Sequence, residues 1–101
     1  MNEHEEYEAW KAELYEALRD NMPEFAGKAT GDGDFEKVGF AVGAAYEPEG
    51  KRGGMIVAIT ITDEDSPRKG KHTQLDPNWR NDDPEKVARD AIAAYLKLRE
   101  W

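Results

Sequence analysis

Ser66 is the only serine of the chain, and it lies in the segment DEDSPRKGKHT together with Asp63, Asp65 and His72. Hydroxyl, imidazole and carboxylate are the groups of a hydrolytic triad, in which the histidine accepts the proton of the attacking hydroxyl. A triad also needs an oxyanion hole and a cleft, and one short turn offers neither. Ser-Pro is a common way to begin a turn. We therefore expect a turn here, and no enzymatic activity.

A second group of oxygen donors occurs in GDGDFEKVG, where Asp32, Asp34 and Glu36 alternate with other residues. A calcium loop of the EF-hand type needs glycine at its sixth position and glutamate at its twelfth. Counted from Asp32, those positions hold Lys37 and Gly43, so we expect an acidic turn and no metal. The chain has no cysteine, which excludes thiolate chemistry and cysteine-based zinc sites. We expect no cofactor.

The acidic residues are concentrated in the first half of the chain. Residues 1–50 carry 13 acids and four bases, whereas residues 51–101 carry nine acids and ten bases, which gives a net charge of −8. Binding to a phosphate backbone depends mainly on lysine and arginine, which displace counterions. We therefore expect no direct nucleic-acid binding. Solubility or a salt-adapted source would also explain this composition.

Apolar residues recur every three or four positions at the start of the chain, which predicts a helix that ends at Met22-Pro23. This apolar stripe is Tyr7, Trp10, Leu14, Ala17 and Leu18. Glutamates occupy the other faces of the same helix: Glu3, Glu5, Glu6, Glu8, Glu13 and Glu16. The glycines and aspartates of EFAGKATGDGDF, residues 24–35, indicate a loop.

From residue 37 the apolar period changes to two, which is typical of strands. We predict strands over residues 37–46, 55–63 and 71–75, with turns over 47–54 and 64–70. In the last segment, NDDPEKVARDA opens a closing helix, with Asp83 as N-cap and Pro84 at its first position. Capping and the helix dipole account for the acids Asp82, Asp83 and Glu85 without a functional role.

These elements predict a single α+β domain over residues 1–101 with the order αβββα, a three-stranded antiparallel meander with both helices packed on one face. The order resembles that of the double-stranded-RNA-binding domain. That family opens its last helix with lysines and has a histidine in its first strand connection, and this chain has neither, so we carry over no function. Six apolar residues should lie under the helices: Val38, Phe40, Val42, Val57, Ile59 and Ile61.

Two features favour contact with a partner. The opposite face of the first strand would carry small residues, Gly39, Ala41, Gly43 and Ala45, with Ala58 on the next strand. Such a bare, flat face can approach a second copy in a homodimer; alternatively, the glycines only ease strand twist or bulging. Trp79 and Arg80 lie in the polar loop DPNWRND and are residue types enriched at interface hot spots. Alternatively, Trp79 folds back onto the edge of the core.

The hypothesis is a small, non-enzymatic, cytoplasmic protein without a membrane span, whose carboxylates imitate nucleic-acid phosphates and bind a protein partner with a basic surface. Anti-CRISPR and anti-restriction inhibitors of phages are similar in size and composition. The expected partner-binding residues are Glu6, Glu13, Glu16, Asp32, Asp34, Trp79 and Arg80. Two alternatives stay open: a nucleic-acid-binding module that uses the turn bases Lys51, Arg52, Arg68, Lys69 and Lys71, and a scaffold without a ligand.

Overall fold

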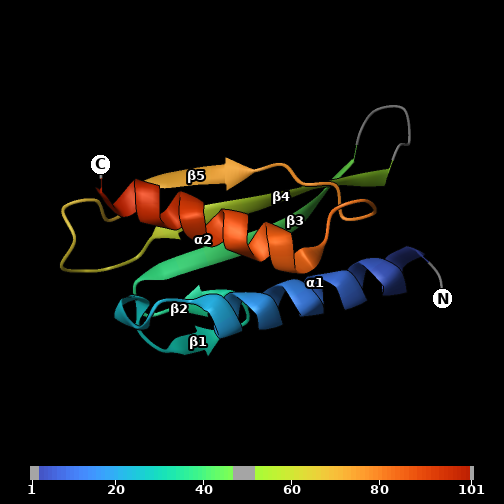
Figure 1. Ribbon diagram of the computed structural model, residues 1–101. Helices are drawn as coiled ribbons and strands as arrows, with labels where there is room; N and C mark the ends of the chain where they lie inside the picture. Colours follow the sequence, from blue (N-terminus) through green and yellow to red (C-terminus); the bar gives the residue numbers. More distant parts are fainter. Residues whose placement is uncertain (1–2, 47–51, 101) are drawn as a thin grey trace.

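The protein is described by a computed structural model, which covers residues 3–46 and 52–100 (Figure 1). It begins with helix α1 (Glu3–Asn21) and a short 3₁₀ helix, η1 (Glu24–Ala26). Five strands follow: β1 (Ala29–Gly31), β2 (Asp34–Phe35), β3 (Val38–Tyr46), β4 (Arg52–Ile61) and β5 (His72–Leu75). Helix α2 (Pro84–Glu100) ends the described chain.

The strands form one antiparallel sheet in the order β1-β2-β3-β4-β5. Its centre is the long β3–β4 pair, in which Val38 lies opposite Ile61 and Val42 opposite Val57. The predicted α+β class, the two helices and the antiparallel sheet are confirmed. The predicted number of three strands is wrong, because residues 24–35, predicted as a loop, contribute β1 and β2. The predicted turn over residues 47–54 overlaps the start of β4 at Arg52, and residues 47–51 lie outside the described residues.

The β1–β2 hairpin lacked a sequence signal because its strands are short and largely polar. All three residues of β1 are exposed, and β2 has two residues, of which only Phe35 is buried. Gly33 in the tight connection has a φ of +74°, a conformation that glycine adopts without strain. Tertiary contacts complete the hairpin, because the Phe40 N–H donates to the Gly33 carbonyl oxygen at 2.7 Å.

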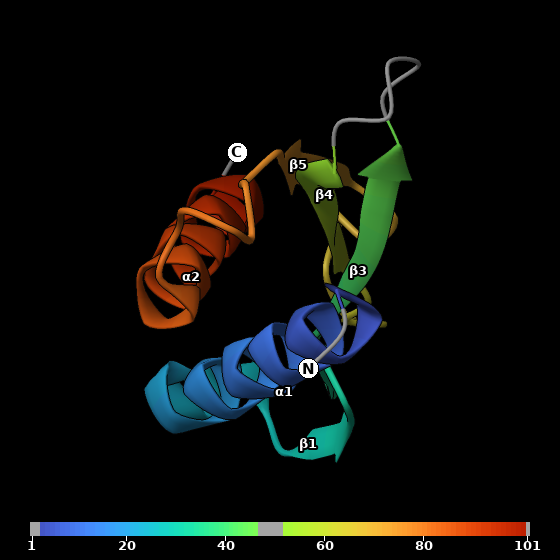
Figure 2. The ribbon, with the colours of Figure 1, turned by 90° about the vertical axis from the view of Figure 1, so that its right-hand side faces the viewer.

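Both helices lie on the same side of the sheet, and β1 curls beneath α1 (Figure 2). Trp10, Leu14 and Leu18 of α1 and Tyr95 of α2 are buried in one core with the inner residues of β3 and β4. Of the six residues predicted under the helices, five are buried and Val42 is partly buried and packed against that core. The two helices run in the same general direction in Figure 1. The first turn of α2 lies beside the second half of α1, because residues 83–85 and residues 13–21 line the same groove.

Candidate partner-binding surface

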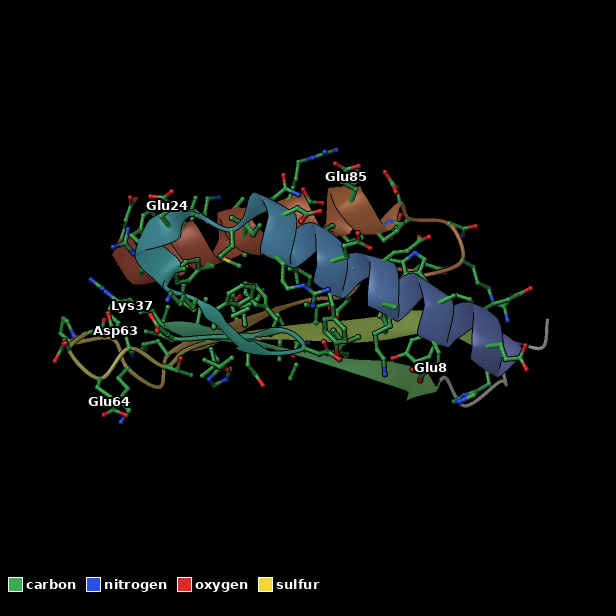
Figure 3. The ribbon with its side chains drawn as sticks, turned by 90° about the horizontal axis from the view of Figure 1, so that it is seen from below. Glu8, Glu24, Lys37, Asp63, Glu64 and Glu85 are labelled. Atoms are coloured by element: carbon green, nitrogen blue, oxygen red, sulfur yellow. The ribbon has the colours of Figure 1, made fainter. Side chains whose placement is uncertain are left out.

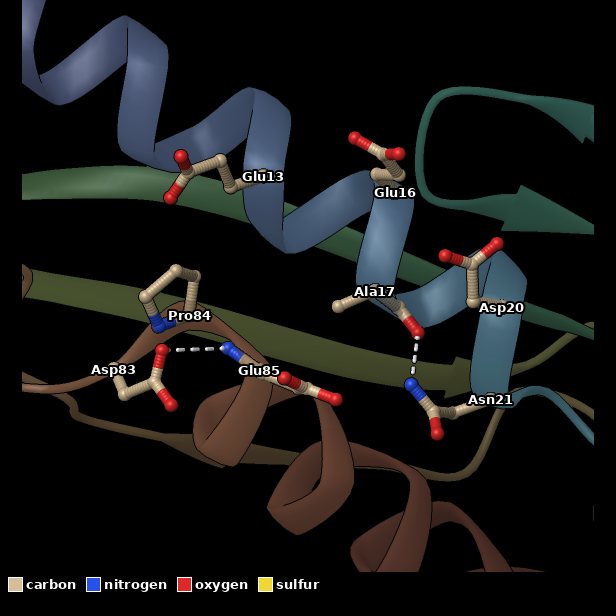
Figure 4. A pocket seen from close by; sticks show the side chains of 8 residues that line it. All are labelled: Glu13, Glu16, Ala17, Asp20, Asn21, Asp83, Pro84 and Glu85. Atoms are coloured by element: carbon tan, nitrogen blue, oxygen red, sulfur yellow. Dashed lines mark hydrogen bonds between the residues drawn. The ribbon is translucent and has the colours of Figure 1, made fainter.

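An open groove of about 360 Å³ lies between the second half of α1 and the first turn of α2. Figure 4 shows its carboxylates projecting from successive turns of α1, with the start of α2 across from them. Its lining residues are Glu13, Glu16, Ala17, Asp20, Asn21, Asp83, Pro84 and Glu85. Five of these eight are carboxylates and none is a base, so the groove carries a strongly negative potential.

Few of these carboxylates are neutralised by the protein itself. The Glu85 Oε1 lies 3.4 Å from the Arg89 guanidinium one turn further along α2, in an exposed pair. Within residues 3–46 and 52–100, no basic side chain lies within 4 Å of Glu13, Glu16 or Asp20. Exposed ion pairs contribute at most about 1 kcal/mol, and these three carboxylates lack even that compensation. Their charge is available to a partner.

The acids that open α2 also have structural roles, as the sequence predicted. The Asp83 carboxylate accepts a hydrogen bond from the Glu85 N–H at 3.4 Å, which is the contact of an N-cap. The Asp82 carboxylate accepts from the Asn78 N–H at 2.8 Å and closes the loop before the helix. Capping accounts for why acids occur here, and it fixes Asp83 at the edge of the groove.

The predicted acidic residues fall on different sides of α1. Glu6, Glu13 and Asp20 are seven residues apart, so they share one face of the helix. Asp32 lies in the connection between β1 and β2. It approaches α1 from another side, where its carboxylate lies 3.5 Å from the Arg19 guanidinium. Other carboxylates lie outside the groove, and Figure 3 labels three of them, Glu8, Asp63 and Glu64.

Asp34 borders a third surface, the outer face of the sheet. Its backbone pairs with Gly39, and its carboxylate would lie 3.5 Å from a β carbon added to that glycine. Ala41 and Gly43 are exposed on this face, and Ile56 is 37% exposed. No helix covers the face within the described chain, as predicted (Figure 2); the side chain of Ala45 lies outside the described residues.

Trp79 packs at the edge of the core, which is the alternative prediction made for it from the sequence. Its side chain is 8% exposed, and its ring meets that of Tyr7 edge-on with centroids 5.6 Å apart. The Arg80 guanidinium lies 4.7 Å from the indole centroid. Arg80 is exposed and Trp79 is not, so any contact with a partner here would be made by the arginine.

Sequence reasoning missed Asp20 as part of the groove, and it assigned Asp83 and Glu85 to capping alone. The signal for Asp20 was its spacing of seven residues from Glu13. The proximity of the α2 acids depends on how the two helices pack, and no local pattern contains that information.

Within the described chain, no three histidine, aspartate or glutamate side chains converge on a point where a metal could bind. The groove carboxylates therefore surround a space without sharing a centre. No described helix has both the length and the apolar composition needed to cross a membrane. No family model, no curated protein and no solved structure matches this chain.

Proposed function

We propose that the protein is a non-enzymatic inhibitor that binds a nucleic-acid-handling protein by imitating nucleic acid, as phage anti-defence proteins do. The observation that carries the proposal is the groove between α1 and α2, with five carboxylates and no base in its lining. A basic channel built for phosphates would be attracted to such a surface, and this attraction accelerates association at low salt.

The charge density supports this assignment. Glu13, Glu16 and Asp20 follow one another at intervals of three and four residues, or about 5 Å along the helix axis at 1.5 Å per residue. One strand of a duplex carries one phosphate per about 3.4 Å of axis. The α1 row therefore has more than half the linear charge density of a strand, and Asp83 and Glu85 add charges beside it.

The test compares two variants with the same net charge. The groove variant combines Glu13→Gln, Glu16→Gln and Asp20→Asn. Its control removes three exposed acids elsewhere, with Glu24→Gln, Asp65→Asn and Glu100→Gln. Wild-type protein, groove variant and control are each immobilised and incubated with a bacterial lysate, and the retained proteins are identified by mass spectrometry.

We expect wild type and control to retain nucleic-acid-binding proteins that added duplex DNA releases, and the groove variant to lose them. Raising the salt concentration should weaken retention, because the attraction is electrostatic. Equal retention by the groove variant and the control would contradict the proposal. Binding of labelled DNA or RNA by the protein itself would favour the nucleic-acid-binding alternative, which depends on turn bases such as Arg68 and Lys71.

A further inference from the structure

Strand β5 is the last strand on its side of the sheet, and no described strand pairs with its outer edge (Figure 1). In an antiparallel pair, alternate residues direct their N–H and C=O groups to the neighbouring strand. Ile61 N–H donates to the Lys71 carbonyl at 2.9 Å, and Met55 N–H donates to the Pro77 carbonyl at 3.1 Å. Odd-numbered residues of this segment therefore face β4.

The even-numbered residues His72 and Gln74 consequently direct their backbone groups away from the sheet. The register agrees, because His72 lies opposite Thr60 and Gln74 opposite Ala58. The open edge thus presents two N–H donors and two C=O acceptors in alternation. Only another extended polypeptide matches that alternation with its own backbone.

A second groove, of about 300 Å³, adjoins this edge. Its walls are His72 and Thr73 of β5 and Ala94, Lys97 and Leu98 of α2. Ala94 and Leu98 are partly buried hydrophobic residues that adjoin the core, so they offer an apolar surface for a side chain. No carboxylate lines this groove, in contrast to the groove between α1 and α2.

We propose that the β5 edge and this groove bind an extended peptide segment that carries acidic side chains, which adds to the sheet beside β5. His72 and Gln74 would bond its backbone, Ala94 and Leu98 would contact an apolar side chain, and Lys97 would pair with a carboxylate. This surface is separate from the acidic groove, and the proposal does not depend on the function proposed above.

Other occupants fit this surface less well. A phosphate backbone offers acceptors only, so the carbonyl groups of His72 and Gln74 would stay unpaired beside it, at a cost in free energy. A second copy that paired through β5 would bring Lys97 of both copies towards the same seam, where like charges repel. An acidic peptide satisfies the backbone groups and the charge together.

The experiment uses three synthetic peptides of about eight residues, the length of an ordinary strand, in which valine alternates with glutamate, threonine or lysine. Each is titrated into the ¹⁵N-labelled protein. We expect the glutamate peptide to bind most tightly and to shift the amide signals of His72, Gln74, Ala94 and Leu98. The lysine peptide should shift signals near Glu13 and Glu16 instead. No shifts at β5 with millimolar glutamate peptide would overturn the proposal.

Two variants of one residue separate the backbone contact from the side chain. Gln74→Pro removes an outward N–H that β4 does not use, and proline is tolerated at such edge positions. Gln74→Thr keeps that N–H. We expect Gln74→Pro to lower the affinity for the glutamate peptide about tenfold, the effect of one lost hydrogen bond with its partner group left unpaired. Gln74→Thr should change this affinity little. Equal binding by both variants would overturn the proposal.

The charge contact is tested with Lys97→Gln, which should reduce the preference for the glutamate peptide over the threonine peptide and leave the threonine peptide unaffected. Circular dichroism of each variant checks that the fold is kept. A doubled mass in light scattering that Gln74→Pro abolishes would assign the edge to a second copy and overturn the peptide proposal. Duplex RNA that shifts the same β5 signals more strongly than the glutamate peptide would also overturn it.

Discussion

The indole N–H of Trp10 donates a hydrogen bond to the backbone carbonyl oxygen of Asp82 at 2.8 Å. This bond joins the middle of α1 to the residue that precedes the N-cap of α2, across 72 positions of sequence. It helps to hold the first turn of α2 beside α1, where Asp83 and Glu85 complete the acidic groove.

Trp10→Phe should therefore cost more stability than Trp79→Phe. The two indoles are almost equally buried, at 9% and 8% exposure, so the loss of ring area is similar. Within the described chain only Trp10 donates a hydrogen bond from its ring nitrogen. We expect the difference to be about 1 kcal/mol, the ordinary contribution of one hydrogen bond. Urea denaturation followed by circular dichroism measures it, and equal costs would contradict it.

Gly33 should not tolerate alanine. Its φ of +74° is unfavourable for any residue with a β carbon, and an added β carbon would lie 2.5 Å from the Phe40 carbonyl oxygen. We expect Gly33→Ala to destabilise the protein by about 1–3 kcal/mol. Gly43→Ala is the matched control, because an added β carbon there meets nothing within 4 Å. Thermal melts of both variants decide the point, and similar melting temperatures would be the contrary result.

Two substitutions of Asp83 separate the effect of its capping hydrogen bond from the effect of its charge. Asp83→Asn keeps an oxygen that can accept from the Glu85 N–H, so stability should change little, whereas Asp83→Ala should cost about 1 kcal/mol. Both variants remove the same charge from the groove. If the groove binds a basic partner, both should weaken that binding alike. Urea denaturation and affinity for a captured partner, measured on both variants, provide the comparison.

Ionisation of the Tyr95 phenol should lower the free energy of unfolding at high pH. Burial raises the pKa of Tyr95 above the ordinary value of 10.0, Arg99 opposes this and Asp63 adds to it. The folded state therefore keeps the phenol proton at pH values where the unfolded state releases it. The stabilisation is complete below pH 10.0 and is lost as the pH rises through the folded pKa.

Urea midpoints between about pH 9 and pH 11 should consequently decline more steeply for the wild type than for Tyr95→Phe. Tyr95→Phe lacks the titrating hydroxyl and keeps the aromatic ring. In the wild type the centroid of the Tyr95 ring lies 6.4 Å from that of Phe25. Parallel declines would show that other groups dominate in this range.

The sequence predicted those parts of the fold in which apolar periodicity is strong. Both helices, the β3–β4 pair and Asp83 as the N-cap could be read from spacing and residue type. The β1–β2 hairpin could not, because its strands are polar and depend on contacts such as the hydrogen bond between Phe40 and Gly33. The complete acidic groove could not be predicted either, because it depends on how the two helices pack. Only Glu13 and Glu16 of its lining were identified from the sequence as partner-binding residues.

The two grooves differ in the sign of the charged side chains that line them. Glu85 lines the acidic groove at the start of α2 and Lys97 lines the other groove near its end, and these two residues are about 18 Å apart along the helix axis at 1.5 Å per residue. A protein with charges separated in this way experiences a torque in the field of a charged body as well as a net force. It would turn its α1–α2 side towards a basic partner before the two surfaces touch, so that a larger share of collisions begin in a productive orientation.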